Sequence, residues 1–184
     1  MKKEFLNLIS NAIGLEPLLI NSKLLVPQSR PRFYWANWGF KSPLCNGSII
    51  ADILEPIVDT KYYLSERFLK GFANSNSVFK DRFKPHNIET INAHCLTARY
   101  YKMGKTDPYF KYPNGDIRRF TPRECGRMQG VPDKILNKIL SANISDTQLY
   151  KMFGNGWTID VIAHIFSSMD LPIQVVARQL ELFE

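Results

Sequence analysis

The block from Arg118 to Asp133 constrains the fold more than any other part of this sequence. It reads Arg-Arg-Phe-Thr-Pro-Arg-Glu-Cys-Gly-Arg-Met-Gln-Gly-Val-Pro-Asp. Within it, Thr121 can cap a helix whose first position is Pro122 and whose first turn carries Glu124. Three local signals for a helix start agree here, so the sequence predicts that a helix begins at this point.

Apolar spacing predicts the elements before this block. Residues 2–13 carry apolar side chains at helical spacing, and Gly14 suits the end of that helix. Residues 18–20 and 32–35 favour two strands, joined by a connection in which Pro27 interrupts regular structure.

The middle and the end of the chain differ in pattern. Residues 43–117 alternate short apolar runs with Pro, Asn, Gly and Asp, as in residues 74–76, which predicts a loop-rich segment. Ser145 favours a helix that runs to about Phe153, and the last dozen residues fit a short helix or a tail. Another helix, ending before Pro172, carries an apolar stripe made of Trp157, Val161, Ile162, Ile165 and Phe166.

Positive charge is concentrated in the middle of the chain. The net charge is +7, and residues 61–119 hold twelve Lys and Arg against five Asp and Glu. The same segment holds eleven of the chain's aromatic residues, and basic side chains among aromatic rings suit a nucleic acid. A solvated basic face over an aromatic core explains the pattern equally well.

Composition excludes several classes of protein. With 184 residues, 45% of them hydrophobic, the chain can bury a core as one domain or two small lobes, and no apolar run is long enough for a membrane span. The cysteines Cys45, Cys95 and Cys125 are odd in number and lack zinc-site spacing. We therefore expect reduced thiols, no metal, no membrane partner and a cytoplasmic location.

Three blocks in order resemble the cytosine-5 DNA methyltransferase family: residues 28–34 (Gln-Ser-Arg-Pro-Arg-Phe-Tyr), residues 118–133, and residues 150–157 (Tyr-Lys-Met-Phe-Gly-Asn-Gly-Trp). The resemblance implies an α/β fold, the C-terminal portion of a Rossmann-like S-adenosylmethionine-dependent methyltransferase with a loop-rich target-recognition lobe. By this resemblance residues 1–42 end the catalytic domain, 43–117 form the lobe, and 118–184 are helices that return to the catalytic domain. The double-stranded DNA substrate and a restriction-modification or phage setting follow from the same resemblance.

The family's roles carry over to particular residues of this chain. Arg32 is expected to reach the O2 edge of a flipped cytosine, because a guanidinium offers several fixed donors. Arg30 is expected beside it in the same base site. Gln28 is expected to order the site and to contact the DNA backbone. The lobe segment Leu-Thr-Ala-Arg at residues 96–99 also matches the family. The further expected DNA contacts are Arg99, Lys102, Lys105, Arg118 and Arg123.

The last block implies a cofactor site. Asn155, Gly156 and Trp157 are expected to contact S-adenosylmethionine, and the tryptophan is typical of vertebrate de novo methyltransferases and their phage relatives. The alternative is that Trp157 is a core anchor after a helix-breaking turn.

The sequence contains no Pro-Cys dipeptide, no Glu-Asn-Val and no glycine-rich N-terminal turn, so the family's nucleophile is missing. Cys125 follows Glu124 in a predicted helix and does not suit that role. Met1 lies where the family would continue past Glu-Asn-Val. We expect a C-terminal subunit or fragment of a cytosine-5 DNA methyltransferase that needs an N-terminal partner half, also for binding the cofactor. The alternatives are a catalytically silent DNA-binding or regulatory module of a methyltransferase complex and a decayed gene fragment.

Overall fold

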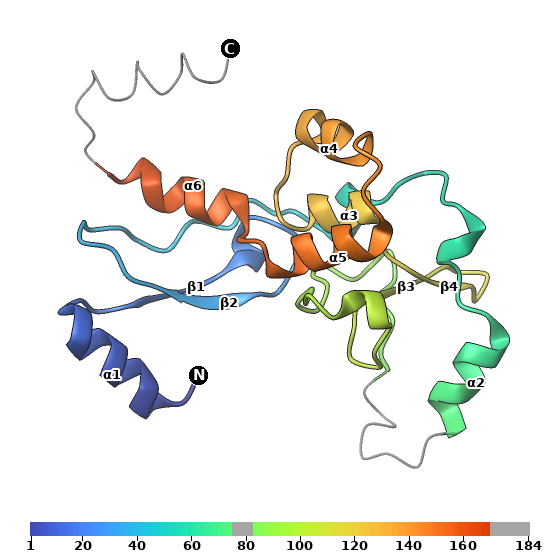
Figure 1. The fold of residues 1–184 in the computed structure, drawn as a ribbon, viewed down its shortest axis with the longest axis horizontal. Coiled ribbons are helices and arrows are strands. Elements are labelled where there is room, and N and C mark those ends of the chain that lie inside the picture. Colours follow the sequence, from blue (N-terminus) through green and yellow to red (C-terminus); the bar gives the residue numbers. More distant parts are fainter. Residues whose placement is uncertain (75–82, 170–184) are drawn as a thin grey trace.

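The computed structural model describes residues 1–74 and 83–169 (Figure 1). Part of the turn predicted at residues 74–76 and the whole predicted C-terminal segment lie outside the described residues. The described chain folds around two hydrophobic clusters, and each joins segments that are distant in the sequence.

The smaller cluster lies between a strand pair and the last described helix. Strands β1 (Leu18–Asn21) and β2 (Pro31–Tyr34) pair antiparallel. Helix α6 (Ile159–Ser167) lies on one side of this pair and helix α1 (Lys3–Ile13) on the other (Figure 1). Ile20 of β1 packs with Val161 and Ile165 of α6, so the two ends of the described chain form one unit.

The larger cluster joins the loop-rich middle of the chain to the next three helices. The middle contains helix α2 (Glu66–Asn74), the hairpin of β3 (Tyr109–Lys111) with β4 (Ile117–Arg119), and short 3-10 turns. Helices α3 (Pro122–Arg127), α4 (Asp133–Leu140) and α5 (Asp146–Asn155) follow. The 3-10 turns are η1 (Ser22–Leu24), η2 (Ile50–Ile53), η3 (Thr60–Tyr62) and η5 (Tyr100–Lys102). Buried residues from the middle and from the helices share this core, so they pack as one unit.

Local signals correctly predicted one boundary each of α1, α3 and α5. Thr121 and Glu124 form the reciprocal capping box at the start of α3. Gly14 ends α1 with a φ of 68°, which favours glycine, and Ser145 caps α5. The stripe predicted for α6 is correct for the buried residues Val161 and Ile165 only.

An apolar surface remains uncovered beside β1. Helix α1 buries only Ser10, while its apolar residues face outward. The large side chains left exposed there are Phe5, Leu8, Ile9, Ile13 and, on β1, Leu19.

Candidate base and cofactor site

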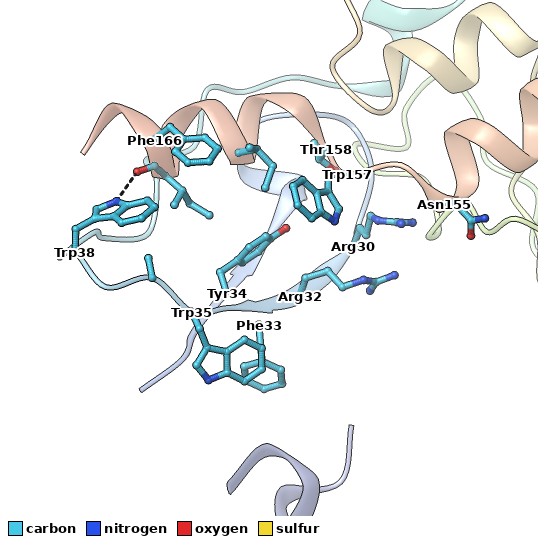
Figure 2. A pocket seen from close by; sticks show the side chains of 13 residues that line it. Arg30, Arg32, Phe33, Tyr34, Trp35, Trp38, Asn155, Trp157, Thr158 and Phe166 are labelled. Atoms are coloured by element: carbon cyan, nitrogen blue, oxygen red, sulfur yellow. Dashed lines mark hydrogen bonds between the residues drawn. The ribbon is translucent and has the colours of Figure 1, made fainter. Parts of the chain in front are cut away.

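A cavity of about 400 Å³ lies between β2, the turn after α5, and α6 (Figure 2). It brings together Arg30 and Arg32, predicted for the base site, with Asn155 and Trp157, predicted for the cofactor site, although they lie up to 127 residues apart. Its other walls are mostly aromatic or aliphatic: Phe33, Tyr34, Trp35, Ala36, Trp38, Thr158, Ile162, Ile165 and Phe166. This size and lining suit a small organic ligand.

Arg32 is the exposed guanidinium at this cavity. Its Nη1 donates to the Pro31 carbonyl at 2.8 Å, and its Nη2 lies 3.7 Å from Sγ of Cys95. Both groups are weak or local partners, so most of the guanidinium fork is available to a ligand. Tyr34 stands beside it, and burial raises the pKa of this phenol although Arg30 and Arg32 oppose the shift. Tyr34 therefore stays neutral at physiological pH.

Arg30 has a different position from the one predicted. Its side chain is buried, and its donors bind the carbonyls of Leu96, Gly154 and Gly156 at 2.7 to 3.1 Å. Because these bonds occupy both terminal nitrogens, we correct its assignment from base contact to positioning. Its guanidinium connects three segments: its own, the segment that contains Leu96, and the turn of residues 154–156.

Gln28 also has a structural position. The side chain is fully buried, and its amide donates to the Met128 carbonyl and accepts from the Leu96 N–H. It therefore cannot contact DNA as predicted. It fixes the segment just before β2 to Met128, directly after α3, and to Leu96.

The three residues predicted to hold the cofactor lie at the cavity or next to it. Asn155 is exposed at the end of α5, Gly156 follows it, and the side chain of Trp157 is 72% exposed. A core anchor would be buried, so that alternative for Trp157 is wrong. In Figure 2 the Trp157 side chain lies near Tyr34 among the residues that line the cavity.

A second cavity of about 390 Å³ carries two of the predicted DNA contacts. Arg99 and Lys102 line it together with Cys95, whose Sγ is also 3.4 Å from Nη1 of Arg30. These two basic residues of the loop-rich middle thus adjoin the first cavity through Cys95. Lys105 differs, because its Nζ donates to the Phe72 carbonyl at 2.7 Å.

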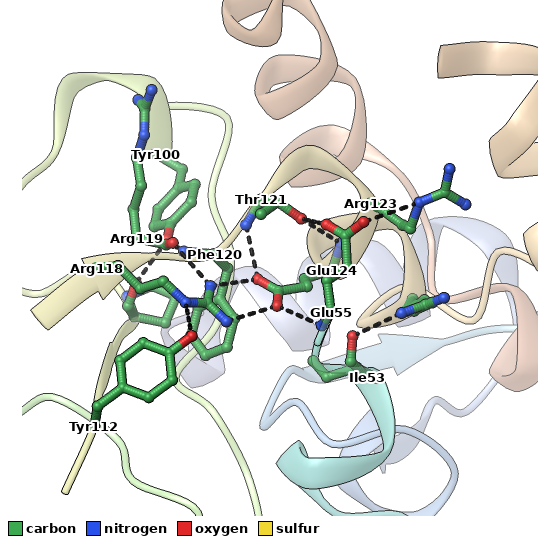
Figure 3. A network of polar contacts seen from close by, with 12 residues as sticks. Ile53, Glu55, Tyr100, Tyr112, Arg118, Arg119, Phe120, Thr121, Arg123 and Glu124 are labelled. Carbon is green, nitrogen blue, oxygen red and sulfur yellow. Dashed lines mark hydrogen bonds and ion pairs between the residues drawn. The ribbon is translucent and has the colours of Figure 1, made fainter. Parts of the chain in front are cut away.

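The two predicted DNA contacts in the Arg118–Asp133 block are engaged elsewhere (Figure 3). Arg118 is fully buried and paired with Glu124, so its assignment to DNA is corrected. Arg123 is partly exposed, and its Nε lies 3.2 Å from Glu55. The Glu124 carboxylate that pairs with Arg118 also accepts the backbone N–H of Glu55, which joins the segment after η2 to α3.

No cysteine is among the described residues that line the first cavity. Cys125 is buried in α3, and burial raises the pKa of its thiol well above the usual range. A thiol of this kind is a poor nucleophile, as the sequence predicted for Cys125. Within residues 1–74 and 83–169, no group of His, Cys, Asp and Glu is placed to hold a metal ion.

Sequence reasoning missed two features of the site. Cys95 between the arginines gave no motif, because it is a single residue 63 positions from Arg32. Gly154 was interpreted as part of a helix-breaking turn, yet it lies within α5 and packs against the backbone of Thr97. The predicted helix ended at about Phe153, one residue too early to place Gly154 inside it.

Comparisons with known proteins identify the family and the fold. A model of the C-5 cytosine-specific DNA methylase family matches residues 16–170. Type II methyltransferase M.NlaX of Neisseria lactamica is 29% identical over 164 residues, covering 83% of this chain and 50% of the relative. Type II methyltransferase M1.ScrFI of Lactococcus lactis is 31% identical over 160 residues, covering 78% of this chain and 40% of the relative.

Solved structures show the same fold. The Entamoeba histolytica methyltransferase EhMeth superposes with a TM-score of 0.70 at 19% identity, over 91% of this chain and 57% of that protein. A mutant of Spodoptera frugiperda DNMT2 gives a TM-score of 0.68 at 20% identity, over 88% of this chain and 61% of that protein. The fold is therefore part of a Rossmann-like methyltransferase.

The chain belongs to the C-5 cytosine-specific DNA methylase family. It spans half or less of the length of the two curated relatives described above. In the described part of the chain, none of the helices has the length and apolar character that a membrane span requires.

Proposed function

We propose that this chain is the target-recognition part of a DNA cytosine-5 methyltransferase and supplies half of its base and cofactor sites. The main support is the cavity that gathers Arg32, Asn155 and Trp157. Arg32 is exposed there with most of its donors available, as expected for a group that binds a ligand's carbonyl oxygen.

Arg32 would donate to the O2 edge of a cytosine turned out of the duplex. In cytosine-5 methylation a thiolate adds to C6 of the ring, and negative charge then develops on the base. A fixed cation beside O2 stabilises that charge more than it stabilises the neutral base, which is how such a contact accelerates the reaction.

The walls of the cavity fit S-adenosylmethionine. The Trp157 indole offers a flat apolar surface and the Asn155 amide offers donors and an acceptor, at a cavity of about 400 Å³. When bound, the cofactor supplies the electrophilic methyl group. The residues of this chain would orient it and exclude water on one side.

A second polypeptide segment would complete the site, carrying the nucleophile and the rest of the cofactor pocket. The uncovered apolar side chains of α1 and Leu19 of β1 favour such a partner, because apolar patches of this kind mark interaction surfaces. The pair β1–β2 is a two-stranded sheet among the described residues, so a partner could extend it by pairing with an edge strand.

The basic loop-rich segment would bind the DNA backbone. Arg99 and Lys102 are exposed and line one cavity next to Cys95, which contacts Arg32. A phosphate contact here would place the adjacent nucleotide near the base site. A regulatory module that only docks onto another enzyme would not need an exposed arginine such as Arg32 at a base site.

The chain's preference for an unpaired cytosine tests this proposal. Fluorescence anisotropy compares a duplex that holds one unpaired cytosine with a fully paired duplex of the same length. We expect the wild type to prefer the unpaired cytosine and Arg32→Ala to lose that preference, while Lys134→Ala on α4 keeps it. Equal affinities of the wild type for both duplexes would remove Arg32 from a base site.

A further inference from the structure

One short segment of the loop-rich middle is hydrogen-bonded to residues 27–29, which directly precede β2. We call residues 93–98 the recognition strap. The Ala93 N–H donates to the Pro27 carbonyl and the Ala93 carbonyl accepts from the Ser29 N–H, both at 2.9 Å. The Leu96 N–H donates to the buried side chain of Gln28 at 2.7 Å. These bonds prevent the strap from moving independently of β2.

Arg30 ties the strap to a third segment, which we call the cofactor turn (residues 154–157). Nη1 of Arg30 donates to the Leu96 carbonyl at 2.7 Å, and Nη2 donates to the carbonyls of Gly154 and Gly156 at 3.1 and 3.0 Å. The guanidinium is planar, so its two nitrogens fix the strap and the turn at one distance and angle. Burial of Arg30 keeps water from replacing these bonds.

The strap and the cofactor turn also touch directly. A Cβ added to Gly154 would lie 2.2 Å from the carbonyl carbon and oxygen of Thr97 and 2.4 Å from the nitrogen of Ala98. Only a residue without a side chain permits this contact. A movement of the strap is therefore transmitted to the turn both through the Arg30 fork and through backbone packing.

We propose that Arg30 is a positioning residue that couples DNA binding at the recognition strap to the order of the cofactor turn. This inference rests on the proposed function. DNA held by Arg99 and Lys102, which follow the strap, immobilises the strap, and the Arg30 fork then restricts the turn that carries Asn155 and Trp157. By reciprocity, a cofactor bound at the turn strengthens DNA binding at the strap.

Amide hydrogen exchange on the full chain, with and without a paired DNA duplex, tests the coupling. In the wild type, DNA should slow exchange in both the strap and the cofactor turn. In Arg30→Lys, which keeps the charge and loses the two-nitrogen fork, DNA should still protect the strap and should no longer protect the turn. Each variant is compared with itself with and without DNA, so a general loss of stability does not imitate the effect.

A second variant leaves Arg30 intact. Gly154→Ala forces the turn away from Thr97 and should also abolish the DNA-dependent protection of the turn. Gly71→Ala is the matched control, because its added Cβ meets open space on α2. DNA protection of the turn that persists in both Arg30→Lys and Gly154→Ala overturns the inference, as does a wild-type turn that DNA leaves unprotected. A strap that DNA does not protect overturns the proposed DNA binding as well.

Discussion

Arg118 and Glu124 form a two-point ion pair in the interior of the molecule. Nη1 of Arg118 lies 2.6 Å from one carboxylate oxygen of Glu124, and Nη2 lies 2.7 Å from the other. Both side chains are fully buried, and the Tyr112 hydroxyl and the N–H groups of Glu55 and Thr121 complete the network (Figure 3). The pair thus joins β4, α3 and the segment that follows η2.

Removal of either partner of this pair should strongly destabilise the protein. In Glu124→Gln the Arg118 charge stays buried without its counter-charge, and we expect a loss of about 3 to 5 kcal/mol in the free energy of unfolding. Arg123→Gln is the control, because its partly exposed pair with Glu55 should contribute less than about 1 kcal/mol. Urea unfolding measures both, and equal losses would contradict the structure.

Replacement of Trp157 should affect the cofactor rather than the fold. Its side chain is 72% exposed, so Trp157→Ala should change the free energy of unfolding by no more than about 0.5 kcal/mol. In the presence of the N-terminal half, the same variant should bind S-adenosylmethionine more weakly by titration calorimetry. If Trp157→Ala bound S-adenosylmethionine as tightly as the wild type, the indole would not contact the cofactor.

Lys102 should contribute to the salt dependence of DNA binding. It is exposed and lines the basic cavity with Arg99, so Lys102→Ala should lower the log–log slope of affinity against salt by about 0.9 on duplex DNA. Lys105→Ala should change the slope less, because its ammonium group is bound to Phe72. Lys134→Ala on α4 is the control, and a slope for Lys102→Ala equal to that of the wild type excludes a phosphate contact.

His86 should make stability depend on pH. Its Nε2 accepts the backbone N–H of His94 at 3.1 Å, which requires a neutral ring. Burial, helped by the charge of His94, lowers the pKa of His86 from 6.5 to about 4. The folded-state pKa is the lower one, so this stabilisation is complete above pH 6.5 and is lost as pH falls toward 4.

Urea unfolding at pH 7 and pH 5 measures this effect. The wild type should lose more stability between the two values than His86→Asn does. His94→Asn removes the exposed ring and keeps the backbone donor, so it should retain most of the pH dependence. Identical pH dependence of the wild type and His86→Asn would show that His86 is not held neutral.

The sequence predicted those parts of the fold that depend on neighbouring residues. The Thr121 capping box, the glycine end of α1 and the Ser145 cap are decided within one turn of helix, so their residues carry the signal themselves. The two strands were also predictable from local sequence. Residues 18–20 and 32–35 are short, mainly apolar runs, and the connection between them contains Pro27.

Neighbouring residues did not predict which arginines are buried and which are exposed. Arg30 and Arg32 are two positions apart in one motif, yet one is buried and the other is exposed. The difference arises from carbonyls 66, 124 and 126 residues away from Arg30. Arg118 likewise resembles a DNA contact in sequence, and only the fold shows that Glu124 and three aromatic rings enclose it.

In the proposed enzyme, this chain supplies Arg32 and the cofactor turn, and the nucleophile lies on another segment. The most direct test is transfer of a labelled methyl group from S-adenosylmethionine to cytosine-containing duplex DNA, with the purified chain alone and with an N-terminal half from a relative such as M.NlaX. We expect no transfer by the chain alone, transfer by the mixture, and a large loss of transfer when the mixture contains Arg32→Ala. Methylation of DNA by the chain alone would contradict this proposal.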